Sequence, residues 1–247
     1  YMLEHKKIQN LSDYFVELNS RREKGVYFYR INGYSEEVGE FIKKYYDTAR
    51  RTGVVIEGKI PNPDEGNLAY YNEIMGMDFQ MSMDFIHVSL RKWLPRMNEF
   101  QRQNVAASIY DSLDSLRKAG KTENMLRNAY IKFMCWLYYK FERIVNQLGE
   151  NHIPKILYEG QISNYELMLI SILSNAGCDV VLLQYAGDQG YLKTDPGSVL
   201  SDSLQMEGLQ PFPQGYCVKK VRDEIQNELN NERPVSYTHL TLPTKLE

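Results

Sequence analysis

The stretch KILYEGQISNYELM, Lys155–Met168, decides the fold because it joins a strand, a turn and the start of a helix. The run KILYE has the composition of a buried strand, and Gly160 suits a tight turn. Ser163 and Glu166 have the spacing of a capping box, in which the serine caps the helix and the glutamate side chain returns to the cap residue. The stretch therefore predicts a strand, a loop and a mostly apolar helix that ends at Gly177.

The segments on either side extend this pattern into βαβ units. Residues 178–185, CDVVLLQY, are nearly all apolar, as expected for a strand covered on both faces of a parallel sheet. Residues 25–60 follow the same order, with strand GVYFYRI, a helix capped by Ser35 and closed by Gly53, and strand VVIEGKI. The sequence therefore predicts an α/β fold of Rossmann-like βαβ units, in a mostly parallel sheet or in two small sheets.

A large helical insert separates the two units. Its apolar residues recur at steps of three and four, which is the period of an amphipathic helix. The clearest stripe predicts one helix from about Glu123 to Leu148, and it is more typical of a core or a partner-helix seam than of a cofactor site. The stripe consists of Leu126, Tyr130, Phe133, Leu137, Phe141, Ile144 and Leu148.

The chain divides into four segments by these patterns. The tail PVSYTHLTLPTKLE matches, from Val235 to Thr244, the translation of a sequencing adapter, so we expect it to lie outside the natural fold. Because the chain starts at Tyr1 rather than at Met, we also expect an internal fragment of a longer protein. The segments are the N-terminal flank with the first βαβ unit (1–62), the helical segment (63–150), an incomplete second Rossmann-like segment (151–233) and the adapter-derived or tag sequence (234–247).

Composition excludes several classes of protein. The net charge of −3 and the pI of about 5.9 give no reason to expect a nucleic-acid binder. No apolar run approaches the length of a membrane span, and no secretory signal is present. Cys135, Cys178 and Cys217 are odd in number and lack the spacing of zinc ligands, which indicates reduced thiols and a cytoplasmic location.

Position rather than motif indicates where a ligand would bind. The sequence contains no P-loop, no dinucleotide fingerprint, no nucleophile elbow and no zinc-protease motif. In parallel α/β sheets, ligands bind beyond the carboxyl ends of strands, where helix N-termini favour anions. The loops 32–35, 58–64, 159–163 and 187–190 satisfy this rule and predict a nucleotide or nucleotide-sugar site. The candidate residues are Gly33, Ser35, Glu159, Gly160, Ser163, Gly187 and Asp188.

Each candidate also has an ordinary structural interpretation. Glu159 could bind a ribose diol or act as a base, or it could be a solvated loop acid. Ser163 is sufficiently explained as a helix cap, and Gly160 as a turn residue, although a phosphate could also approach that glycine closely. Asp188 and Asp195 could hold a metal with a phosphorylated ligand, or they could be turn acids. No particular metal or cofactor is indicated.

Two segments carry a resemblance to a known family. LRNAYIKFMCWLYYKFE, Leu126–Glu142, followed by residues 153–183, IPKILYEGQISNYELMLISILSNAGCDVVLL, resembles the bacterial YceG-like family. That family is described as a component of a biosynthetic module and accompanies tellurite-resistance and stress-response operons. The resemblance covers about Trp93 to Pro213. It implies a cytoplasmic bacterial protein linked to metal or envelope stress, and it supplies no catalytic residue.

Two hypotheses about function follow. The first is an enzyme subunit that binds a nucleotide or nucleotide-sugar at the strand-end loops, which a pocket joining Gly33, Gly160 and Gly187 would favour. The second is a non-catalytic interaction module that docks other stress-operon proteins through the aromatic helix. An exposed apolar patch along Phe133, Leu137 and Phe141 would favour the second hypothesis.

Overall fold

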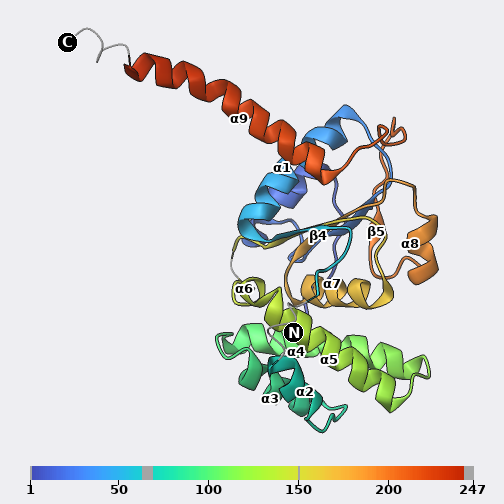
Figure 1. The fold of residues 1–247 in the computed structure, drawn as a ribbon. Coiled ribbons are helices and arrows are strands. Elements are labelled where there is room, and N and C mark those ends of the chain that lie inside the picture. Colours follow the sequence, from blue (N-terminus) through green and yellow to red (C-terminus); the bar gives the residue numbers. More distant parts are fainter. Residues whose placement is uncertain (1, 63–68, 150, 242–247) are drawn as a thin grey trace.

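One parallel sheet organises the whole chain (Figure 1). The computed structural model describes residues 2–62, 69–149 and 151–241. Its five-stranded sheet has the order β2-β3-β4-β1-β5, and every pairing is parallel. The predicted α/β class is confirmed, with a single sheet in place of two small ones. The strands are β1 (Phe28–Ile31), β2 (Val54–Glu57), β3 (Lys155–Glu159), β4 (Asp179–Leu183) and β5 (Asp202–Ser203).

Helices cover both faces of this sheet and form the insert. The sheet helices are α1 (Glu36–Thr52), α7 (Asn164–Ala176), α8 (Gln189–Thr194) and α9 (Val218–Thr241). The insert contains α2 (Ala69–Met75), α3 (Met83–Trp93), α4 (Glu99–Lys118), α5 (Glu123–Tyr139) and α6 (Glu142–Val145). Two short 3-10 helices, Leu11–Phe15 and Leu18–Ser20, precede β1. None of the helices in the described ranges combines the length and the apolar character needed to cross a membrane.

The sheet separates two hydrophobic cores. Leu157 and Val181 pack under α1 on one face, whereas their neighbours Ile156 and Val180 pack towards α7 and the insert on the other. This alternation follows from the two-residue period of a strand. Figure 1 shows α1 and α9 above the sheet, with α7 and the insert below it. Because both faces are covered, the near-continuous apolar run of β4 is explained.

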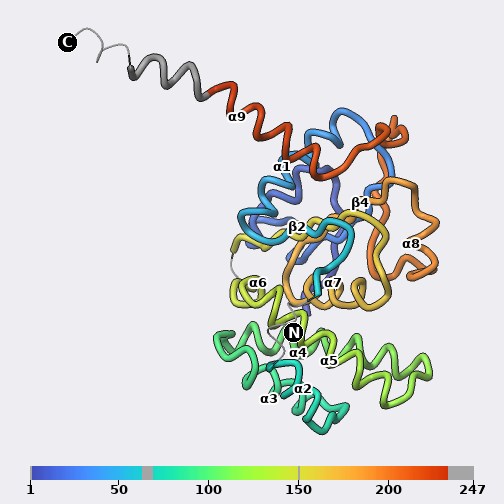
Figure 2. Tube along the Cα trace, viewed as in Figure 1, coloured from blue at the N-terminus to red at the C-terminus, as the bar shows by residue number. Residues whose placement is uncertain are grey.

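The two halves of the sequence interleave in the sheet. β1 and β2, which belong to residues 1–62, are separated by β3 and β4, which belong to residues 151–233. The trace in Figure 2 shows the insert hanging below this shared sheet as a separate layer of helices. Residues 1–62 and 151–233 therefore build one hydrophobic unit together, and neither buries its strands alone.

Three sequence predictions are corrected by the structure. The helix predicted from Glu123 to Leu148 ends at Tyr139, and α6 follows after a break at Lys140 and Phe141. The apolar spacing continues across the break, so the pattern could not reveal it. The loop predicted at residues 187–190 is cut short by α8, and β5 was not expected. Residues 234–241, expected to lie outside the natural fold, continue α9 without adding a strand.

A buried ion cluster fixes the amino edge of the sheet. Asp179 begins β4 and receives hydrogen bonds from Arg21 Nη2 at 2.6 Å and from Lys155 Nζ at 2.5 Å. Burial alone would raise the pKa of Asp179, but Lys155 and Arg21 hold it below its usual value. Tyr14 adds a hydrogen bond from its hydroxyl to the carbonyl of Val180. The cluster therefore ties the N-terminal segment to the edge opposite the predicted ligand site.

Candidate functional site: the carboxyl edge of the sheet

The predicted site residues all lie along the carboxyl edge of the sheet. Gly33 and Ser35 follow β1, Glu159 ends β3, and Asp188 lies just beyond β4. Neighbouring loops touch through backbone hydrogen bonds, such as Gly160 N to Leu183 O at 3.2 Å. The order of the strands divides this edge into a half formed by β1 and β4 and a half formed by β2 and β3.

The β1/β4 half is where a ligand would be expected from topology alone. β1 leads into α1 on one face of the sheet, whereas β4 leads into α8 on the other face. Such a divergence marks the switch point at which open α/β sheets usually bind ligands. In this protein the position is covered by residues 208–217, which we call the strap.

The strap contacts the first loop directly. Tyr34 N donates to Gln210 O at 2.6 Å, and Gln210 N donates to Tyr34 O at 2.8 Å. A Cβ atom added to Gly33 would lie 3.0 Å from the Cβ atom of Leu209. The close approach that a glycine permits is therefore made by the protein's own backbone rather than by a ligand.

Aromatic rings hold the strap in place. The ring of Phe212 lies 5.7 Å from that of Tyr34, 4.9 Å from that of Tyr185 and 5.2 Å from that of Tyr216, measured between centroids. The angles between the ring planes are tilted or edge-on, as aromatic pairs prefer. The β1/β4 half is thus filled by a packed aromatic cluster.

Glu159 is engaged by the same region. Its Oε1 atom accepts hydrogen bonds from the Tyr185 hydroxyl at 2.5 Å and from Val218 N at 2.6 Å. Burial and the hydrogen bond to Glu159 raise the pKa of Tyr185 well above its usual value, so this hydroxyl remains a donor. Because Val218 begins α9, Glu159 acts as a cap for that helix.

The two serines are helix caps. Ser35 Oγ accepts from Val38 N at 3.2 Å, and Ser163 Oγ accepts from Glu166 N at 3.4 Å. The predicted capping box is wrong in its second half, because the Glu166 side chain does not return to the backbone of Ser163. Its Oε2 atom accepts instead from Ile60 N and from the Tyr158 hydroxyl, each at 2.7 Å. Its Oε1 atom still accepts from the Ser163 hydroxyl at 2.7 Å, so this buried carboxylate joins the start of α7 to β3 and to the loop after β2.

Asp188 is paired with an arginine inside the sheet. Arg30 Nε and Nη2 donate to the two carboxylate oxygens of Asp188 at 2.8 and 2.7 Å. Arg30 is 1% exposed, and its guanidinium lies 4.2 Å from the ring centroid of Tyr191. A bidentate pair of this kind is a strong, directional contact.

Asp188 and Asp195 do not share a site. Asp195 accepts from the Tyr191 hydroxyl at 2.6 Å and from the backbone N–H groups of Val199 and Leu200. Within the described ranges, no three His, Cys, Asp or Glu side chains gather as a metal site would require. Gly187 and Gly160 both have positive φ, at 93° and 106°, which accounts for glycine in these turns without a ligand.

The β2/β3 half differs, because it opens into a groove. The groove has a volume of about 600 Å³ and lies between α2, α5 and the start of α7. Its position is consistent with the strand-end rule, since Asn62 belongs to the loop after β2 and Tyr165 begins the helix after β3. Residues 63 and 64 of the predicted loop lie outside the described residues. The lining consists of Asn62, Tyr71, Met75, Asn128, Ile131, Lys132, Cys135, Trp136 and Tyr165.

One cation and several aromatic rings dominate the chemistry of the groove. Lys132 Nζ lies 5.3 Å from the ring centroid of Trp136 and 5.1 Å from that of Tyr165. Among the described residues, the lining includes no carboxylate, and Lys132 has no ion pair. Burial raises the pKa of the Cys135 thiol to about 11, so the thiol is neutral at physiological pH. The groove therefore offers flat apolar surfaces beside a single positive charge.

The groove was not predicted from the sequence. The apolar stripe of α5 indicates core packing, and Lys132 lies off that stripe. The core assignment is confirmed for Phe133 and Leu137, which are fully buried, so docking through an exposed patch of these residues is ruled out. The missed signal was the row Asn128, Lys132 and Trp136, which places an amide, a cation and a large ring at four-residue steps.

Comparison with known proteins identifies a matching family but no matching individual protein. A family model described as the YceG domain matches residues 6–227. No curated protein matches the chain, and no solved structure matches it. The resemblance found over about Trp93 to Pro213 is thus confirmed and extends towards the N-terminus, over the first βαβ unit.

Proposed function

We propose that this chain, which belongs to the YceG domain family, binds a nucleotide or nucleotide-sugar in the groove between α5 and α7. The observation that supports the proposal is the aromatic lining of the groove beside Lys132. In keeping with the family resemblance, we propose that the protein acts in the cytoplasm of bacteria. There it would serve a biosynthetic module associated with tellurite resistance and stress, together with other proteins of that module.

The groove matches the physical needs of such a ligand. Its volume of about 600 Å³ lies within the usual range of small-molecule sites. A base can stack on Tyr165, which is half-buried, or on Tyr71, which is 39% exposed, because every base presents a flat π-face. A phosphate can attract the ammonium group of Lys132, which has no carboxylate partner in the described part of the chain. Ligand binding would therefore cost few existing contacts.

Charge favours the open half of the edge over the covered half. Glu36 and Glu37 lie in the first turn of α1, immediately beyond the Gly33 loop. Their carboxylates occupy the positive end of the helix dipole and would repel a phosphate there. An anionic ligand therefore has an electrostatic reason to bind beside Lys132 rather than at the end of β1.

A thermal-shift series with nucleotides and nucleotide-sugars tests the proposal. A ligand present at about 100 times its Kd adds roughly 2.7 kcal/mol of stability, which should raise the Tm by several degrees. Lys132→Met should weaken the shift, whereas Lys140→Met, an exposed position outside the groove, should leave it unchanged. An equal shift in the wild type and in Lys132→Met would place the ligand elsewhere, and no shift with any compound would refute the proposal.

A further inference from the structure

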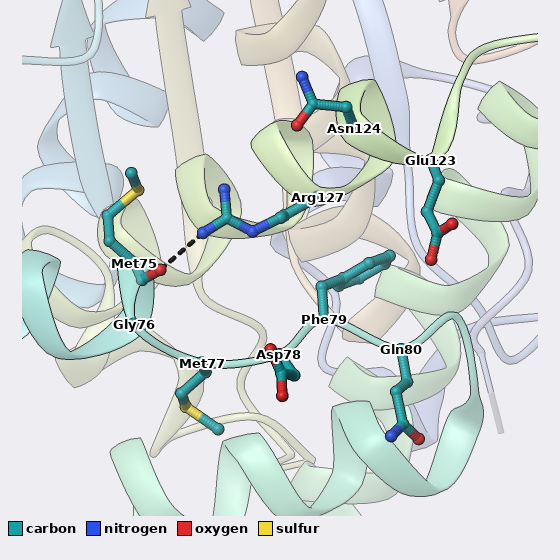
Figure 3. A pocket seen from close by; sticks show the side chains of 9 residues that line it. All are labelled: Met75, Gly76, Met77, Asp78, Phe79, Gln80, Glu123, Asn124 and Arg127. Atoms are coloured by element: carbon teal, nitrogen blue, oxygen red, sulfur yellow. Dashed lines mark hydrogen bonds between the residues drawn. The ribbon is translucent and has the colours of Figure 1, made fainter.

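A second cavity lies at the other end of the same helix. This hollow has a volume of about 580 Å³ and lies between the start of α5 and the segment that follows α2 (Figure 3). Its walls are mainly polar, in contrast to the aromatic groove. The lining consists of Met75, Gly76, Met77, Asp78, Phe79, Gln80, Glu123, Asn124 and Arg127.

The hollow and the groove share one face of α5. Asn124 lines the hollow, and Asn128, Lys132 and Trp136 line the groove at successive steps of four residues. Residues four apart lie above one another on a helix, so these side chains form a continuous row. From Asn124 to Trp136 the row spans roughly 18 Å at 1.5 Å per residue. That is the length of an extended two-part ligand.

Met75 is the side chain that both cavities share. It lines the hollow and the groove, and it is more than one-third exposed. Figure 3 shows Arg127 reaching from α5 to the carbonyl oxygen of Met75, to which its Nη2 atom donates at 2.6 Å. The end of α2 is therefore fixed by its backbone, while the unbranched side chain of Met75 can adapt to a ligand that passes it.

The chemistry of the hollow suits hydroxyl groups rather than phosphates. Asp78 and Glu123 contribute two carboxylates, and neither has an ion pair with another described residue. Ionised carboxylates accept hydrogen bonds and repel anions, whereas the amides of Gln80 and Asn124 both donate and accept. Arg127 adds a guanidinium to the lining, and one of its N–H groups is engaged by the carbonyl oxygen of Met75. A polyhydroxyl group can bond to carboxylates, amides and a guanidinium alike, whereas a phosphate would meet two carboxylates beside the one cation.

We propose that the ligand is a nucleotide-sugar that lies along α5. Its base and phosphates occupy the groove beside Trp136 and Lys132, and its sugar occupies the hollow between Asp78 and Glu123. This inference rests on the proposed function, and it selects the nucleotide-sugar over the simple nucleotide. The inference is based on the order of polar and aromatic side chains along one face of α5.

Calorimetric titration with matched pairs of ligands tests the inference. The pairs are uridine, adenosine and guanosine diphosphate, each compared with its hexose conjugate. For the base that binds, the conjugate should bind about tenfold more tightly than the diphosphate, because the sugar adds hydrogen bonds to charged acceptors. Asp78→Asn and Glu123→Gln should each remove most of this gain. Asp84→Asn, an exposed acid on α3 outside both cavities, is the matched control and should retain the gain.

The outcomes separate the two proposals. If a diphosphate binds and its conjugate binds no more tightly, the sugar subsite is refuted while the groove proposal stands. If the gain survives in both Asp78→Asn and Glu123→Gln, the sugar lies elsewhere and the inference is also refuted. If neither member of any pair binds, the groove proposal fails and the inference fails with it.

Discussion

The two halves of the carboxyl edge are both formed by parallel strands, but one half is covered by the strap and the other is open. Beyond β1 and β4, the side chains of Ser35 and Asp188 and the backbone of Tyr34 are engaged by the protein itself. Beyond β2 and β3, the edge continues into a groove whose lysine and rings have room beside them. The topology of the sheet indicates the edge at which a ligand can bind. Which part of that edge is available depends on which polar groups already have hydrogen-bond partners within the protein.

The largest expected effect comes from Asp188 in the covered half. Asp188→Ala would leave the buried guanidinium of Arg30 without its counter-ion, which should cost about 2–3 kcal/mol. This cost is smaller than for a fully buried ion pair because the Asp188 side chain is 24% exposed. Urea denaturation measures this cost, and ligand affinity at the groove should not change.

Asp47 supplies the control for that experiment. It pairs with Arg50 and Arg51 on the outer surface of α1. Asp47→Ala should therefore change the free energy of unfolding by less than about 1 kcal/mol. A stable Asp188→Ala variant that has lost ligand binding would break the comparison, because it would make Asp188 part of a binding site.

Next in size is the removal of the ring that holds the strap. Phe212→Ala should destabilise the protein by about 2 kcal/mol, since a half-buried phenylalanine loses contacts with three aromatic neighbours. The more exposed Phe100, at 50%, is the control and should cost less when it is truncated. If truncation of Phe212 instead improved ligand binding, the strap would cover a site rather than complete a core.

In the open half, we expect a substitution to change ligand affinity rather than stability. Lys132→Met should lower the affinity for the bound nucleotide about tenfold, equivalent to about 1.4 kcal/mol, because the phosphate loses its nearest cation. Its effect on unfolding should stay within about 0.5 kcal/mol, as for other exposed substitutions. Titration calorimetry and urea denaturation of the same variant provide both numbers. A large loss of stability with unchanged affinity would reverse the roles assigned to the two halves.

The smallest effect is expected at Gly33. Gly33→Ala should cost about 1 kcal/mol or less, because the new methyl group meets Leu209 at 3.0 Å and the half-buried strap can shift slightly. Ligand affinity should remain at the wild-type value. Affinity that falls while stability is retained would return Gly33 to the ligand site that the sequence first suggested.

Much of the fold could be predicted from local patterns. The caps at Ser35 and Ser163 and the closing glycines Gly53 and Gly177 mark helices that the structure contains. The break after Tyr139 was missed, because the same apolar spacing continues on both sides of it. The capping role of Glu166 was also misjudged, since its partners Ile60 and Tyr158 come from other parts of the chain.

The candidate site was predictable only in outline. The rule of strand ends selected residues such as Glu159, which caps a helix that begins at Val218, and none of the candidate residues lines the groove. Lys132 was not predicted as a site residue because a lysine on an amphipathic helix is usually a solvated charge. Its neighbour Tyr165 belongs to a different helix, and nothing in the local sequence joins the two.

By itself, the sequence determined the class of the fold, the position of most elements and the edge where loops gather. These depend on the periods of strands and helices and on caps, which act over a few residues. Only the tertiary structure decided that β3 and β4 would separate β1 from β2, that the strap would pack against Tyr34, and that α5 would face Tyr165. Such contacts join residues far apart along the chain, and their energies depend on which surfaces remain to be buried once every element has formed.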